Sequence, residues 1–297
     1  MAKVDVIIPA YNASKYLPFA IESVIAGTFA DWRIILVDDG STDDTAKVAA
    51  RYANQLGPRF LYIFQENRGL PAARNTAIQH SSADLLALLD ADDVWLPNRL
   101  STSVRAFESP DVGLAYGLIT QIDTEGKLLG TFRGNPKWAA GRIAPWIYMR
   151  KVELPCPTLT FRRSAVDEVG PFDETMRATE DRDLWFRIAL RYEVAFIPEV
   201  IAYYRISPAS MSTDPERMLR AQLQFIRKHF GAEGCGIRQR QIALARAYKQ
   251  RGEALKLRNR RAAALASSLR ALALYPLDPD NIRTAASLIL TCLGLKR

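Results

Sequence analysis

Apolar residues recur with two alternating periods along the first 95 positions of the chain. Four short and nearly uninterrupted apolar runs are typical of buried β-strands, and the stretches between them have helical spacing. The predicted strands are residues 4–9, 33–39, 59–65 and 83–90, and the predicted helices run from Ser14 to Ala26, from a cap at Ser41 or Thr42 to Tyr52, and from Leu70 to His80. This alternation predicts an α/β fold with a Rossmann-like, mainly parallel sheet flanked by helices.

The pattern changes after Pro97. We expect a β-hairpin at 111–123 and 127–132, strands at 157–163, 193–198 and 200–205, and a helix from Glu180 to Arg191. From about Pro215 the pattern is helical, and one segment resembles a single tetratricopeptide-like hairpin. The predicted organisation is a domain at 1–214, with halves at 1–97 and 98–214, followed by an α-helical extension at 215–297.

Basic residues are concentrated in that extension. The whole chain has 40 Lys and Arg against 32 Asp and Glu, and the part from Glu216 onward holds 17 of the former and 5 of the latter. Such asymmetry indicates a surface for anions, either nucleic acid or an acidic membrane leaflet. The alternative is a solvated, Arg-rich helical face.

The cysteines and the N-terminus favour a cytoplasmic protein. Cys156, Cys235 and Cys292 are far apart and odd in number, which suits reduced thiols. With two histidines and no Cys-x-x-Cys pair, a zinc site is not expected. The sequence shows neither a secretory signal nor an apolar run long enough to span a bilayer.

Two acidic clusters each follow a predicted strand. VDDGSTDDT places Asp38 and Asp39 at the end of the second strand, and LDADD places Asp90 and Asp92 at the end of the fourth. Ligands of open α/β sheets bind at the carboxyl ends of the strands, so we expect both clusters to face one crevice. Carboxylates there can accept hydrogen bonds from a base or ribose, and an Asp-x-Asp pair suits Mg²⁺ or Mn²⁺.

Each cluster also has a purely structural interpretation. Asp39-Gly40 can form a turn, and Ser41 to Asp44 match a capping box, with Asp43 and Asp44 in the first turn of the next helix. Asp92 or Asp93 can cap a helix over VWLPNRL.

The order of five motifs is more specific than any one of them. VIIPAYN, VDDGSTDDT, NRGLPAARN, LDADD and EDRDLWFR together resemble family 2 inverting glycosyltransferases, which have a GT-A fold, over residues 3–212. The resemblance implies transfer of a sugar from a nucleotide sugar to an acceptor hydroxyl, with Mn²⁺ or Mg²⁺ as cofactor. It further implies a role in cell-surface polysaccharide, lipopolysaccharide or glycoprotein glycan synthesis.

The resemblance also implies roles for individual residues. Asp92 would be the metal ligand, and Asp181, beside Glu180, would be the catalytic base. The nucleotide sugar would be bound by Pro9, Ala10, Tyr11, Asn12, Asp38, Asp39, Asn67, Gly69, Arg74, Asn75, Asp90 and Ala91. The residues alone allow another interpretation of EDRD, as an acidic first helical turn with an i,i+4 partner in Arg187.

The chain departs from the family pattern at two positions. Many relatives have a His two residues after the Tyr-Arg of a late strand, whereas Tyr204-Arg205 is followed here by Ile206-Ser207, which leaves the third metal ligand open. Ala77 also stands where a Gly is frequent.

The acceptor site is less defined. Trp138, Trp146 and Tyr148 can stack on sugars or serve as hydrophobic packing. The resemblance implies a UDP-sugar donor, or a GDP- or dTDP-sugar, and a glycan or lipid-linked acceptor. It favours peripheral contact of the basic helices with the cytoplasmic membrane face over nucleic acid. The alternative to an enzyme is a nucleotide-sugar-binding scaffold that acts through its helical tail.

Overall fold

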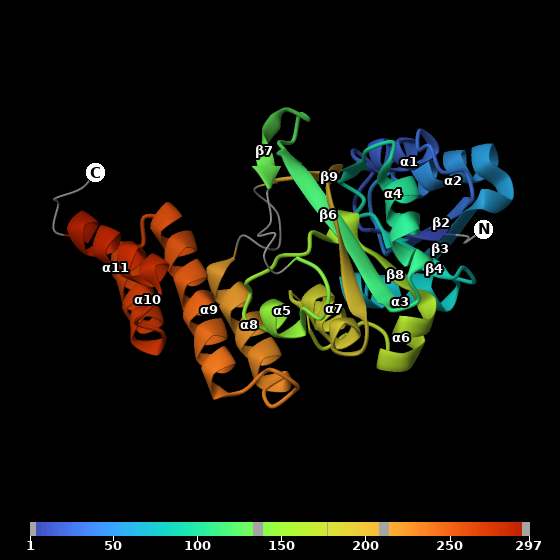
Figure 1. Cartoon of the computed structure of the whole chain (residues 1–297). Helices are drawn as coiled ribbons and strands as arrows, with labels where there is room; N and C mark the ends of the chain where they lie inside the picture. The colour runs from blue at the N-terminus through green and yellow to red at the C-terminus, as the bar shows by residue number, and fades with distance from the viewer. Residues whose placement is uncertain (1–3, 133–138, 177, 208–213, 293–297) are drawn as a thin grey trace. The chain divides into compact units, whose positions relative to one another are not determined.

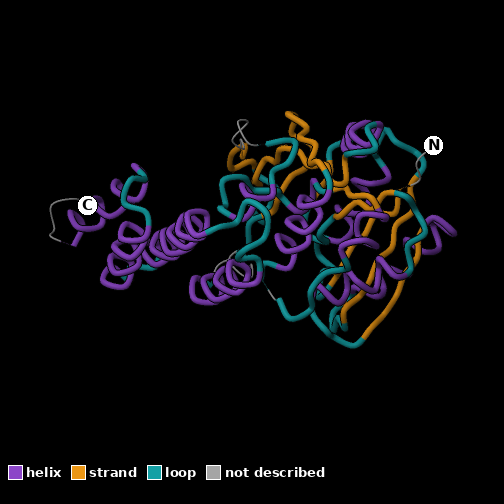
Figure 2. Tube along the Cα trace, turned by 60° about the horizontal axis from the view of Figure 1, so that its bottom comes forward, coloured by secondary structure: helices purple, strands orange, loops and turns teal. Residues whose placement is uncertain are grey.

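The computed structural model describes residues 4–132, 139–176, 178–207 and 214–292. The chain forms two compact units. The first consists of Met1–Ile143 and Val152–Ser207, and the second of Ala144–Lys151 and Pro208–Arg297. Figures 1 and 2 show a sheet flanked by helices in the first unit and packed helices in the second. The sequence pattern gave no sign that residues 144–151 pack with the C-terminal helices.

The described part of the first unit contains one nine-stranded sheet. Its strands are β1 (Val4–Ala10), β2 (Trp32–Asp39), β3 (Phe60–Gln65), β4 (Leu85–Leu88), β5 (Val94–Trp95), β6 (Val112–Ile122), β7 (Leu128–Phe132), β8 (Thr160–Arg162) and β9 (Glu193–Arg205). They follow the order β3-β2-β1-β4-β8-β6-β9-β5, and β7 pairs with β6. The parallel pairing of β1 with β2 and β4, and of β2 with β3, confirms the predicted arrangement of the first four strands.

The rest of the sheet is mixed. β8 runs antiparallel to β4 and β6, whereas β6 and β9 are parallel. Two separate strands were predicted where β9 is continuous, because Pro198 interrupts the apolar pattern. The pairing skips Pro198 and Glu199: Ile197 lies opposite Gly117, and Val200 lies opposite Leu118. This irregularity accommodates a proline that cannot donate a ladder hydrogen bond.

Helices cover the sheet because its strands are apolar on both faces. They are α1 (Leu17–Ile25), α2 (Thr45–Leu56), α3 (Leu70–Gln79), α4 (Arg99–Arg105), α6 (Arg163–Val169) and α7 (Glu180–Arg191). The predicted cap of α2 at Ser41 or Thr42 is wrong. Asp43 accepts hydrogen bonds from the Thr45 and Ser14 N–H groups, so its carboxylate closes a loop before the helix begins.

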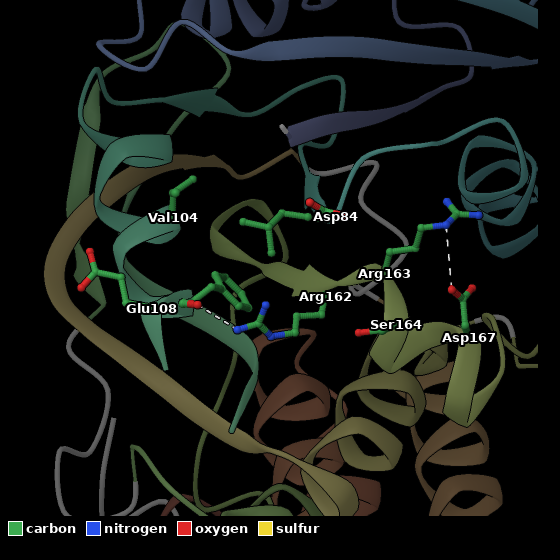
Figure 3. A pocket seen from close by; sticks show the side chains of 9 residues that line it. Asp84, Val104, Glu108, Arg162, Arg163, Ser164 and Asp167 are labelled. Atoms are coloured by element: carbon green, nitrogen blue, oxygen red, sulfur yellow. Dashed lines mark hydrogen bonds and ion pairs between the residues drawn. The ribbon is translucent and has the colours of Figure 1, made fainter. Parts of the chain in front are cut away.

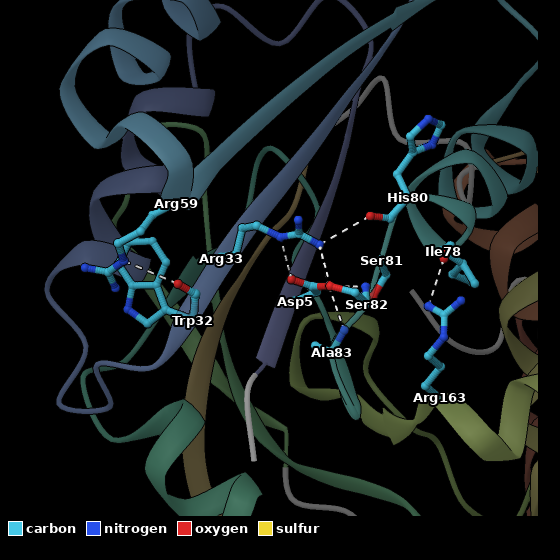
Figure 4. Close-up of polar contacts among 10 residues, drawn as sticks. All are labelled: Asp5, Trp32, Arg33, Arg59, Ile78, His80, Ser81, Ser82, Ala83 and Arg163. Carbon is cyan, nitrogen blue, oxygen red and sulfur yellow. Dashed lines mark hydrogen bonds and ion pairs between the residues drawn. The ribbon is translucent and has the colours of Figure 1, made fainter. Parts of the chain in front are cut away.

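Asp5 holds the amino ends of the strands together (Figure 4). Its fully buried carboxylate accepts two 2.9 Å hydrogen bonds from Arg33, one of 2.6 Å from Ser81, and one each from the Ser82 and Ala83 N–H groups. Burial alone would raise the pKa of Asp5, but these donors outweigh it and hold the pKa below its ordinary value. The network ties β1 to β2 and to the segment that enters β4.

The second unit is helical over its described residues. It contains α5 (Ala144–Tyr148), α8 (Pro215–Lys228), α9 (Ile237–Leu257), α10 (Arg261–Leu274) and α11 (Pro279–Cys292). This confirms the predicted C-terminal helices. Gly252 permits the close approach of α9 and α10, since a Cβ there would lie 2.6 Å from the Ser268 hydroxyl. None of the helices in the described residues is long and apolar enough to cross a membrane.

Candidate active site

The first two loops at the carboxyl ends of the strands are joined by hydrogen bonds. Asn12, which has a positive φ of 49°, donates its N–H to Ser41 Oγ at 2.9 Å. Its side-chain oxygen accepts the Thr42 N–H at 2.8 Å. Tyr11 beside it is 55% exposed, while Pro9 and Ala10 end the buried strand β1. The IPAYN segment and the acidic loop after β2 therefore form one rigid wall.

Asp38 and Asp39 are buried and bonded to the protein itself. Asp38 accepts hydrogen bonds from the Ser41 N–H and the Tyr62 hydroxyl. Asp39, 4% exposed, accepts from the Gln65 side chain at 2.6 Å and from the N–H groups of Arg68 and Gly69 at 2.9 and 2.8 Å. These bonds anchor the loop that contains Asn67 and Gly69. A nucleotide contact by Asp38 or Asp39 stays a prediction.

The glycine after this pair permits that anchoring. Gly40 has a φ of 78°, and a Cβ on it would lie 2.8 Å from the Asn67 backbone nitrogen. Both the positive φ and the close approach require a residue without a side chain. The DDG motif (38–40) and the NRG motif (67–69) therefore lie in two loops that pack directly against each other.

Arg74 joins three of the sequence motifs. It lies on α3, is 2% exposed, and donates to Asp90 Oδ1 at 2.8 Å and to Glu180 Oε1 at 3.1 Å. It also donates to the Cys156 sulfur at 3.1 Å. Burial would lower the pKa of Arg74, but the facing acidic groups raise it, so the guanidinium stays charged. A single buried cation therefore links the segments that contain ARN, LDADD and EDRD.

Asn75 fixes the approach to α7. Its amide nitrogen donates to the Phe172 carbonyl and to Glu174, both at 2.9 Å, and its oxygen accepts the Phe172 N–H at 2.9 Å. The side chain is 6% exposed. In this structure the polar atoms of Asn75 bind the segment before α7.

The turn after β4 concentrates carboxylates. Ala91 is buried there, whereas Asp90 and Asp92 are partly exposed. Burial and the charge of Asp90 raise the pKa of Asp92 to about 6. Asp93 is buried, accepts the Arg205 N–H at 2.8 Å, and has one carboxylate oxygen without a hydrogen-bond partner. The helix-cap interpretation is wrong for this turn, because α4 begins at Arg99 and Asn98 precedes it.

The carboxylates of the turn after β4 suit a divalent cation that also binds the substrate. Asp90 and Asp92 are hard oxygen donors, and their mutual repulsion favours a bound positive charge. Within the described residues, however, no group of three or more His, Cys, Asp or Glu side chains surrounds a common point. The residues suit a cation held by one or two carboxylates together with substrate phosphates.

Glu180 and Asp181 begin α7 on the other side of Arg74. Glu180 is 5% exposed, whereas Asp181 is partly exposed. Burial and the charge of Asp181 raise the pKa of Glu180 to about 7, although Arg74 opposes this. Asp183 pairs with Arg187 at 2.8 Å one turn later. The structural interpretation of EDRD therefore holds for Asp183, while Glu180 and Asp181 lie at the acidic site.

Arg205 lies at the candidate site, although the sequence motifs do not assign it a role there. Its Nε donates to the Asp92 carbonyl at 2.8 Å and its Nη1 to the Asp123 carbonyl at 2.9 Å. Its guanidinium lies 4.5 Å from the centroid of the Tyr16 ring. Arg205 thus orients the LDADD turn from β9. The Tyr204-Arg205 pair at a strand end was the available signal, whereas nothing in the sequence indicated Cys156.

Two of the predicted acceptor aromatics, Trp146 and Tyr148, belong to the second unit. Tyr148 is fully buried, donates to the Ile226 carbonyl at 3.0 Å and packs on Phe225. This is the packing interpretation of Tyr148. The ring of Trp146 lies 5.4 Å from Lys151 Nζ. Trp138 lies outside the described residues.

A separate cavity of about 560 Å³ lies at the amino end of β4 (Figure 3). Asp84, Leu85, Phe107 and Arg162 contribute to its lining. The Arg162 guanidinium donates to the carbonyls of Val112, Phe107 and Ser109, so it serves to join β6 and β8 to the segment before β6. This end of β4 is opposite to the acidic site, which follows its carboxyl end.

Comparison with known proteins defines the class. Residues 5–170 match the profile of Glycosyl transferase family 2. An uncharacterized glycosyltransferase of Nostoc sp. is 31% identical over 245 residues, which cover 76% of this chain and 74% of that protein. The chain therefore belongs to glycosyl transferase family 2 and is a glycosyltransferase. It spans 64% of the length of a similar protein of Rickettsia prowazekii, which is 28% identical over 69% of this chain.

One further relative and two solved structures have more specific names. The Escherichia coli UDP-Glc:alpha-D-GlcNAc-diphosphoundecaprenol beta-1,3-glucosyltransferase is 26% identical, over 74% of this chain and 83% of that protein. Solved structures with the same fold include S. aureus TarS in complex with UDP-GlcNAc (TM-score 0.65, 19% identity, 98% of this chain and 92% of that chain). Another is a mannosyltransferase of Pyrobaculum calidifontis with GDP-Man and Mn²⁺ (TM-score 0.66, 19% identity, 99% and 80%). These likenesses confirm a GT-A fold.

Proposed function

We propose that this glycosyltransferase is metal-dependent and inverting, and that it transfers a sugar from a nucleotide sugar to a glycan or lipid-linked acceptor. The observation that carries the proposal is the buried bridge from Asp90 through Arg74 to Glu180. It brings the carboxylates suited to a metal and the carboxylates suited to a base to two sides of one guanidinium. The reaction needs both kinds of carboxylate, because a metal must offset the negative charge of the donor and a base must take the proton of the attacking hydroxyl.

On the donor side, Asp92 would hold Mn²⁺ or Mg²⁺, and Asp90 would face the ribose or sugar. A bound cation would neutralise charge on the donor phosphates and help the nucleoside diphosphate leave. The rigid wall formed by Asn12, Ser41 and Thr42 would shape the nucleotide pocket together with Tyr11. UDP is the expected nucleotide, with GDP and dTDP as alternatives.

On the acceptor side, Asp181 would take the proton from the attacking hydroxyl. It is partly exposed, whereas Glu180 is buried against Arg74, so Asp181 is the carboxylate that an acceptor can reach. The oxygen would attack the anomeric carbon as the bond to the diphosphate breaks. One base without a carboxylate nucleophile gives a single displacement and therefore inversion.

The compartment and pathway are parts of the same proposal. Cys156 and Cys235 are free thiols, which suits the cytoplasm. The E. coli relative is named for a diphosphoundecaprenol-linked acceptor, which supports a lipid-linked acceptor in cell-envelope glycan synthesis. Such an acceptor would bring the enzyme to the membrane surface.

Nucleotide release from UDP-, GDP- and dTDP-sugars with Mn²⁺ or Mg²⁺ tests the proposal. Wild type should release nucleotide from one donor class, and EDTA should abolish the release. Asp92→Asn and Asp181→Asn should each reduce it at least about 100-fold. Asp44→Asn is the matched control, since the Asp44 side chain is 68% exposed and pairs with Lys47. Donor binding without release in wild type would support the scaffold instead.

A further inference from the structure

The turn between α9 and α10 combines four cations with an exposed apolar side chain. Residues 256–261 read KLRNRR, and we call this segment the basic turn. Leu257 within it is 87% exposed, the largest exposed fraction among the large apolar side chains of the described residues. No Asp or Glu occurs from Ala254 to Leu277. The acids whose charges interact with Arg258 and Arg260 are Asp214 and Glu216, at the start of α8.

The basic turn is held rigidly by the helices beneath it. The N–H groups of Arg258 and Arg260 donate to the Leu255 carbonyl, and that of Asn259 donates to the Lys256 carbonyl. Asn259 has a φ of 57°, a left-handed conformation that closes the turn. Leu255, Ala264 and Leu288 form a buried cluster below. Leu257 thus stays outside the core while the backbone around it is fixed.

Helix stability accounts for only part of this composition: Lys256 in the last turn of α9 and Arg258 at its C-cap suit the helix dipole, whereas the cations that follow do not. Arg260 is the N-cap of α10 and Arg261 its first residue, and the first turn has neither an acidic residue nor a side-chain cap. Cations at a helix N-terminus oppose the helix dipole and are unfavourable. Leu257 gains nothing from burial. The cations at the start of α10 and the exposed Leu257 are therefore both unfavourable in the protein alone, and a binding partner would explain both.

We propose that the basic turn docks the protein on an anionic lipid bilayer. Lys and Arg side chains are attracted to the negative headgroups, and an exposed Leu can enter the boundary with the acyl chains. Charge complementarity and the apolar tip both favour a bilayer. A nucleic acid would use the cations but has no use for Leu257, and KLRNRR offers no aromatic ring for base stacking.

Co-sedimentation of the full chain with vesicles tests this proposal without any donor or acceptor. Wild type should bind vesicles of phosphatidylglycerol and phosphatidylcholine, and should not bind pure phosphatidylcholine. Arg260→Gln with Arg261→Gln should weaken binding about 25-fold, since each cation near the surface contributes about fivefold. Leu257→Ser should weaken it about tenfold.

Two control variants separate the basic turn from general surface effects. Leu277→Ser removes a Leu that is 84% exposed but lies in the α10–α11 turn beside Asp278, and it should leave binding unchanged. Lys47→Gln with Arg105→Gln removes two exposed cations of the first unit and should also have no effect.

Each other outcome overturns the proposal. It is wrong if wild type does not bind anionic vesicles, or if Leu257→Ser binds them as wild type does. Salt-sensitive RNA binding that depends on Arg260 and Arg261 but not on Leu257, without vesicle binding, would identify a nucleic-acid surface instead. Because the assay needs no catalysis, its failure leaves the proposed transferase activity untouched.

Discussion

Arg74 and Glu180 form an ion pair of 3.1 Å in which both side chains are almost fully buried. The pair joins α3 to the start of α7, and the second amino group of Arg74 reaches Asp90 after β4. Positions that are 106 residues apart in sequence are thus locked by one side chain. The arrangement makes Arg74 a positioning residue for both sides of the proposed reaction.

Replacing Arg74 should therefore impair stability and activity together. Arg74→Gln leaves Glu180 as an uncompensated buried acid and removes the partner of the partly exposed Asp90, which should cost about 3–5 kcal/mol of unfolding free energy. Arg74→Lys should recover only part, because an ammonium cannot match the forked geometry of a guanidinium. Urea unfolding of both variants checks this. Adding Glu180→Gln to Arg74→Gln should restore part of the loss, and strict additivity of the two substitutions would contradict the pairing.

Glu180 should also make stability depend on pH. Its pKa in the folded protein is about 7, above the ordinary 4.5, because burial and Asp181 disfavour its charged form. A carboxyl whose pKa rises on folding stabilises fully below its ordinary pKa, and that stabilisation is lost as pH rises toward 7. Wild type should lose up to about 3 kcal/mol between pH 4.5 and 7.5 relative to Glu180→Gln. Parallel pH curves for the two proteins would refute the assignment.

Asp5 should show the opposite pH dependence. Its pKa is lowered on folding by Arg33, Ser81 and two N–H groups, so its stabilisation is present above the ordinary pKa and is lost as pH falls through the folded value. Asp5→Asn should lower the unfolding free energy by about 3 kcal/mol at pH 7. It should also flatten the acid limb below pH 4. Asp31→Asn, at an exposed position nearby, is the control and should change neither.

Asp39 should control the mobility of the loop it anchors. Asp39→Ala removes the acceptor of the Arg68 and Gly69 N–H groups. Hydrogen exchange at these two amides should accelerate about tenfold or more, while β1 amides keep their protection. Unchanged exchange at Arg68 and Gly69 would show that the loop is held by other contacts.

The sequence predicted the parts of the fold whose periodicity is strong. The buried runs of β1 to β4 and the helices between them could be predicted because each has a single clear period. The continuity of β9 could not, since Pro198 reads as a strand end and only the skipped pairing opposite Gly117 and Leu118 accommodates it.

The candidate site, too, could be predicted only in part. The positions of the strand ends predicted Asp39, Asp90 and Asp92. The sequence does not show which of these carboxylates bind the protein itself rather than a ligand. Asp39 accepts three hydrogen bonds from the loop beside it. The sequence predicts Arg74 as a residue that binds the nucleotide sugar. Its pairing with Glu180 could not be predicted, because the two residues are distant in sequence.

The stereochemistry of donor hydrolysis tests the central claim most directly. Proton NMR within the first minutes of turnover of an α-linked nucleotide sugar, with Mn²⁺-free Mg²⁺ buffer, distinguishes the two anomers of the released sugar. An inverting enzyme with Asp181 as base should release the β-anomer first, and Asp181→Asn and Asp92→Asn should release neither. Initial release of the α-anomer, or unchanged release by Asp181→Asn, would contradict the account.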